Sequence, residues 1–63
     1  MTNDTMYFNC MAIEELVRSM VMRGIDDNLK LVAAVDKEFR PQNAWEMELY
    51  SEAIIYAKQG VLN

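Results

Sequence analysis

Few side chains of this 63-residue chain could act in catalysis, and the sequence offers none of them the second residue, such as a histidine base, that would activate it. Cys10 is the only cysteine, and it lies near the expected start of a helix, where a thiol pKa can be lowered for a redox or nucleophilic role. The alternative, which we expect, is a small core residue. The chain has no histidine, so Ser19 and Ser51 lack the usual base that would activate a hydroxyl.

Two carboxylate pairs are the remaining candidates for a reactive centre. Glu14–Glu15 and Asp26–Asp27 could hold a divalent cation or act as an acid and a base, but only if the two pairs converged on one pocket. Otherwise Glu14–Glu15 lie on a solvated helix face, and Asp26–Asp27 form the N-cap and first turn of a helix. We expect the second arrangement, and therefore a non-enzymatic protein with no catalytic, cofactor-binding or metal site.

The elements that position these residues are predicted to be three helices. They span about residues 10–23, 27–39 and 44–59 of one all-α domain, residues 1–63, that has a short flexible N-terminus. An earlier start of the first helix, at Thr5 or Asp4, is left open, because Met6 and Tyr7 tolerate it. Apolar residues recur at helical spacing throughout, and no second strand-like segment exists to pair with the valine-containing stretch 29–35.

Local signals mark the expected helix ends. Asn9, Asp26 and Asn43 are the predicted N-caps, and Asn43 and Glu46 have the spacing of a capping box. Gly24 is predicted to end the first helix in a left-handed conformation. The other two predicted stops are Pro41, after the second helix, and Gly60, after the third.

Apolar residues make up 52% of the chain, which is more than so small a domain can easily hide. A chain of this size buries only about 60% of the surface that it exposes when unfolded. The second helix is apolar on nearly all sides from Leu29 to Val35, and the third carries two apolar rows. Those rows are Met47, Tyr50, Ile54, Ala57 and Val61, and Trp45, Leu49, Ala53 and Tyr56. We therefore expect self-association, as a homodimer.

The predicted contact surface combines four residues. Trp45 and Tyr50 are of the aromatic types that dominate binding hot spots, and Leu49 lies beside them on the third helix. Met22 falls on the charged side of the first helix, whereas Met20 and Met47 fit the apolar rows and are expected in the core.

The charge distribution disfavours nucleic acid as a partner. The net charge is −4, and no segment forms the basic stripe that neutralises phosphates. The glycine turn between the first two helices leaves a helix-turn-helix DNA-binding regulator as an alternative. The polar N-terminus lacks the features of a signal peptide, and no apolar run reaches the roughly 18–20 residues that span a bilayer. We expect a cytoplasmic protein without a membrane partner.

The opening segment, residues 1–10 (MTNDTMYFNC), together with the length of 63 residues, resembles a group of bacteriophage proteins. These are the small proteins encoded in the early leftward region of lambdoid phages, between the exonuclease and excisionase genes. The resemblance covers the whole chain but carries no catalytic or binding motif. It implies a small helical protein without an enzymatic role, made in the infected bacterium, that favours lysis over lysogeny and perturbs the host cell cycle. From the residues themselves we expect the protein to act by binding an unknown host or phage protein.

Overall fold

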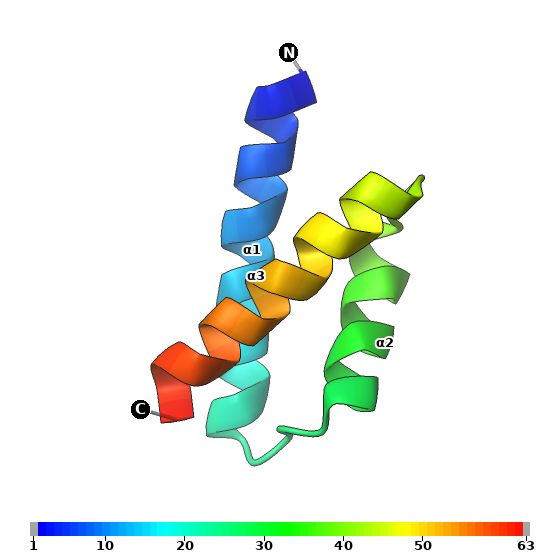
Figure 1. The fold of residues 1–63 in the computed structure, drawn as a ribbon. Helices are drawn as coiled ribbons and strands as arrows, with labels where there is room; N and C mark the ends of the chain where they lie inside the picture. Colours follow the sequence, from blue (N-terminus) through cyan, green and yellow to red (C-terminus); the bar gives the residue numbers. More distant parts are fainter. Residues whose placement is uncertain (1, 63) are drawn as a thin grey trace.

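The computed structural model describes residues 2–62, with side chains described from residue 8 to residue 61. Three helices account for this part of the chain: α1 (Thr2–Met22), α2 (Asn28–Phe39) and α3 (Ala44–Leu62). The described residues contain no strand, so the all-α prediction is confirmed. α2 runs back alongside α1, and α3 then crosses α1 (Figure 1).

The start of α1 differs from the prediction. The helix begins at Thr2 and not near residue 10, so Asn9 lies inside it and is not its N-cap. The Asn9 side-chain amide instead donates a hydrogen bond to the Tyr50 hydroxyl on α3, at 2.9 Å. Asparagine can occupy a helix interior when its side chain finds a partner away from its own backbone.

The end of α1 matches the prediction in detail. Gly24 has a φ of +92°, in the left-handed region that a glycine adopts without a steric penalty. The Gly24 N–H donates to the Val21 carbonyl and the Ile25 N–H to the Met20 carbonyl, both at 2.9 Å. These two bonds define a Schellman motif, which satisfies carbonyl groups that the helix leaves without partners.

The N-cap of α2 lies one residue later than predicted. The N-cap is Asp27, not Asp26, and its side chain makes no capping hydrogen bond. At the other end the helix stops before Pro41, as predicted. Arg40 closes it in a left-handed conformation (φ 47°, ψ 73°), and its N–H donates to the Asp36 carbonyl at 3.0 Å.

The predicted capping box of α3 is present in a modified form. The Glu46 N–H donates to the Asn43 side-chain oxygen at 2.8 Å. The Glu46 carboxylate in turn accepts from the Gln42 N–H at 3.1 Å, one residue before the usual donor. Gly60, by contrast, does not stop the helix, because α3 continues to Leu62. Its predicted left-handed conformation is absent.

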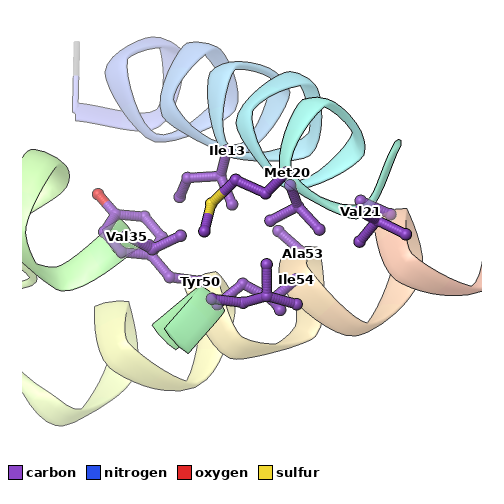
Figure 2. Packing of buried hydrophobic residues seen from close by; sticks show 10 residues of the cluster. Ile13, Met20, Val21, Val35, Tyr50, Ala53 and Ile54 are labelled. Carbon is purple, nitrogen blue, oxygen red and sulfur yellow. The ribbon is translucent and has the colours of Figure 1, made fainter. Parts of the chain in front are cut away.

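The core lies where the three helices meet, and α1 and α3 share the largest contact. Figure 2 shows side chains of α1 and α3 pointing toward one another, with Val35 of α2 beside them. The buried residues are Ile13, Val17, Met20 and Val21 of α1, Leu31 and Val35 of α2, and Tyr50, Ala53, Ile54 and Ala57 of α3.

Two large apolar residues, one of them expected in the core, are exposed. Leu29 projects from the outer side of α2, so this helix does not bury apolar residues all round. Met47 is also exposed, although the sequence placed it in the buried row of α3. The three-helix core is too small to cover both, since α2 contributes only Leu31 and Val35 as fully buried residues.

Candidate interaction surfaces

The four predicted contact residues do not lie on one surface. Met22 and Trp45 are 78% and 61% exposed, and they lie on different helices. Leu49 is partly buried against the core. Tyr50 is only 2% exposed, so its side chain is not available to a partner of this folded chain.

Tyr50 connects all three helices from its position in α3. Its hydroxyl accepts the hydrogen bond from Asn9 of α1. Its ring meets Phe39 of α2 edge to face, with ring centroids 6.3 Å apart and planes at 65°. A buried tyrosine needs such a partner for its hydroxyl, and edge-to-face rings add stabilisation beyond their buried area. The structure therefore explains Tyr50 as a packing residue.

Two of the predicted contact residues belong to a row on α3 that is exposed except at the partly buried Leu49. We call this row the α3 stripe: Trp45, Leu49, Glu52 and Tyr56. They follow one another at steps of four, three and four residues, which places them on one side of the helix. Tyr56 is 67% exposed and Trp45 is 61% exposed. The stripe is acidic, because Glu52 is part of it and the exposed Glu48 lies next to it.

The α3 stripe is largely the second apolar row seen in the sequence. The sequence could not show that Trp45 and Tyr56, at the two ends of this row, face solvent while Ala53 between them is buried. Tyr56 was therefore missed as a surface residue. The small size of Ala53 and Ala57 is the feature of the sequence that could have shown which side of α3 is buried, since small residues let a neighbouring helix approach closely. Both alanines are buried, and Ala53 lies on the side of α3 that meets α1 (Figure 2).

A second exposed row lies on α1, and we call it the outer face of α1: Met11, Glu15, Arg18 and Met22. Its steps are also four, three and four residues. It lies on the side of the helix opposite the buried Ile13, Val17 and Met20, so neither α2 nor α3 covers it. Met11 is 49% exposed. The side chain of Arg18 donates to Glu14 of the same helix at 3.2 Å, and no buried group holds it.

The reactive-thiol interpretation of Cys10 finds no support in its surroundings. Partial burial is the larger cause that raises the pKa of this thiol above its ordinary value of 9.0, and the nearby Glu14 carboxylate raises it further. Both effects disfavour the thiolate, which is the nucleophilic form. Cys10 packs against the core cluster, as a small apolar residue would.

The carboxylate pairs do not meet in a cation site. Within the described side chains, no group of three or more histidine, cysteine, aspartate or glutamate residues is placed to hold a metal ion. Glu14 pairs with Arg18, and Asp26 and Asp27 are exposed beside the start of α2. None of the helices formed by residues 2–62 combines the length and apolar content required to cross a membrane.

Comparisons with protein-family models, curated proteins and solved structures find no match to this chain.

Proposed function

We propose that this chain is a non-enzymatic regulatory protein that acts by binding other proteins, one of them a second copy of itself. The resemblance of its opening residues to lambdoid phage early proteins supports a role in the host cytoplasm, in the choice between lysis and lysogeny or in the host cell cycle. The residue-level support is independent of that resemblance. Eight large apolar side chains are exposed among those described, an excess for so small a domain.

The observation that carries the proposal is the exposure of Trp45 and Tyr56 on the α3 stripe. Tryptophan and tyrosine supply large contact areas at low cost in side-chain entropy. The neighbouring charges, Glu48 and Glu52, give this surface an acidic rim. We expect the α3 stripe to contact a host or phage protein that presents an apolar surface surrounded by basic residues, because complementary charge favours encounter and excludes other partners.

The experiment is a comparison of variants during phage infection of bacteria. Tagged wild-type protein and the variants Trp45→Ala and Tyr56→Ala are used to capture partners, and the frequency of lysogeny is scored in parallel. Leu29→Ala is the matched control, because Leu29 is even more exposed than Trp45 and Tyr56 but lies on α2. Circular dichroism verifies that each variant is folded.

We expect the α3 variants to lose both the captured partner and the effect on lysogeny, and Leu29→Ala to keep both. The proposal is wrong if the α3 variants and the control behave alike. A chain that retards duplex DNA at low salt, with steep loss at higher salt, would favour the helix-turn-helix alternative instead.

A further inference from the structure

The outer face of α1 has the residue spacing of a helix-pairing seam. Met11, Glu15, Arg18 and Met22 take the alternating positions that face a partner helix in a coiled coil. Phe8 continues the same row and is 67% exposed. The exposed neighbours on one flank, Ala12 and Ser19, are small and leave room for a second helix to approach.

When the outer faces of two α1 helices meet, their charges are complementary in one relative orientation only. When two α1 helices lie antiparallel and are centred between Glu15 and Arg18, each Glu15 faces Arg18 of the second copy. In the same register each Met11 faces Met22 of the second copy. A parallel pair in register would instead set Glu15 against Glu15 and Arg18 against Arg18, and such like-charge contacts cost several kcal/mol.

The salt bridge within α1 does not prevent this arrangement. Arg18 donates to Glu14 through Nη2, at 3.2 Å. A guanidinium carries five N–H donors, so Arg18 can keep Glu14 and still donate to Glu15 of a second copy.

The α3 stripe is less suited to self-pairing. The charged residues from 45 to 56 are Glu46, Glu48 and Glu52, all acidic. Two copies that met through this stripe would bring carboxylates together with no cation between them. The two exposed rows therefore fit different partners: the outer face of α1 fits a second copy, and the α3 stripe fits a basic partner.

We infer that two copies of this chain pair through antiparallel α1 helices, with reciprocal Glu15–Arg18 contacts at the centre and Met11–Met22 contacts outside them. The inference specifies the self-association in the proposed function and rests on it. The interface is isologous, since the same surface of each copy meets itself around a twofold axis. It leaves both α3 stripes free for other partners.

Charge reversal tests the pairing. Glu15→Arg and Arg18→Glu each create two like-charge contacts, so each variant should dimerise at least about tenfold more weakly than the wild type in sedimentation equilibrium. The two single variants mixed together should form a heterodimer, because every contact is again between opposite charges. The double variant, Glu15→Arg with Arg18→Glu, should dimerise alone.

Glu38→Arg is the matched control, because it makes the same charge change as Glu15→Arg at an exposed position of α2, outside both rows. It should leave dimerisation unchanged, and thermal unfolding verifies that every variant is folded. If the wild type is a dimer and the single variants remain equally dimeric, the α1 pairing is wrong while self-association stands. If the wild type is a monomer throughout, the α1 pairing and self-association are both wrong. Partner binding by the α3 stripe is still tested separately by its own variants.

The register is tested by disulfide capture under diamide, with Cys10→Ser in every chain. Met11→Cys mixed with Met22→Cys should give a covalent dimer, since these positions face each other. In the antiparallel pair, the two copies of position 11 lie about 16 Å apart along the axis, as do the two copies of position 22, which is too far for a disulfide. Each single variant alone should remain uncrosslinked. Crosslinking of Met11→Cys with itself would show a parallel pair and overturn the inference.

Discussion

At the scale of single residues, Tyr50 and Trp45 show why residue type alone did not separate core from surface. Both are large aromatic residues on α3, and both were predicted to contact a partner. Tyr50 is held in the core by Asn9 and Phe39, whereas Trp45 projects into solvent. The difference depends on which helix lies against each one, and that information is tertiary.

Removal of the Tyr50 hydroxyl should weaken the fold without reshaping it. We expect Tyr50→Phe to lower the free energy of unfolding by about 0.5–1.5 kcal/mol, the usual value of one hydrogen bond, because Asn9 loses its acceptor. Urea denaturation measures the change. Tyr56→Phe, at an exposed position, should stay within about 0.5 kcal/mol of the wild type. Equal losses in the two variants would count against a structural role for the Asn9–Tyr50 bond.

The thiol of Cys10 should react slowly and should make stability depend on pH in one direction. Because its pKa is raised in the fold, the stability linked to this group is fully present below the unfolded pKa of 9.0. It is lost as the pH rises through the folded value. We expect slower alkylation by iodoacetamide in the native chain than in urea at the same pH. The decline in stability above about pH 9 should be smaller in Cys10→Ser.

At the scale of helices, the ends that were predicted correctly depend on local chemistry. Gly24 and Asn43 act through hydrogen bonds to residues within five positions, and both signals can be read from sequence. The role of Asn9 could not be read in this way, because its partner lies 41 residues away on α3. Gly60 carries the local signal of a helix end, but α3 continues through it, with Val61 packed against the core.

The two glycines should therefore respond to alanine with opposite signs. Gly24→Ala should lower stability by about 1 kcal/mol or more, because a Cβ is strained at a φ of +92°. Gly60→Ala should raise it by up to about 1 kcal/mol, since alanine is the better helix former and nothing lies within 4 Å of the added Cβ. Thermal unfolding of both variants measures the signs, and a loss at Gly60 would mean that α3 ends before this residue.

At the scale of the whole molecule, the fold is organised around the crossing of α1 and α3, while α2 covers one side (Figure 1). The composition predicted surplus apolar surface, and the structure places it on all three helices. It could not be assigned to particular faces from sequence, because each helix carries more apolar positions than the core can take. On α3, the side that carries the small residues Ala53 and Ala57 is the buried one.

Filling the α1–α3 crossing should cost more than adding the same group to the surface. Ala57 is fully buried, so Ala57→Leu should destabilise the fold by about 1–3 kcal/mol through overpacking. Ala33→Leu, at an exposed position of α2, should be close to neutral. Denaturation curves of the two variants compare the sites. A neutral Ala57→Leu would show that the crossing is loosely packed.

The dominance of the α1–α3 contact also has a consequence for the order in which the chain acquires structure. α1 leaves the ribosome before α2 and α3, but its main packing partner is the last of these three helices to be made. α1 and α2 alone would leave Ile13 and Val17 without the side chains of α3 that cover them. Folding must therefore wait until α3 has been synthesised and the intervening segment has closed into a loop. Until then the apolar side of α1 is open to chaperones and to other nascent chains.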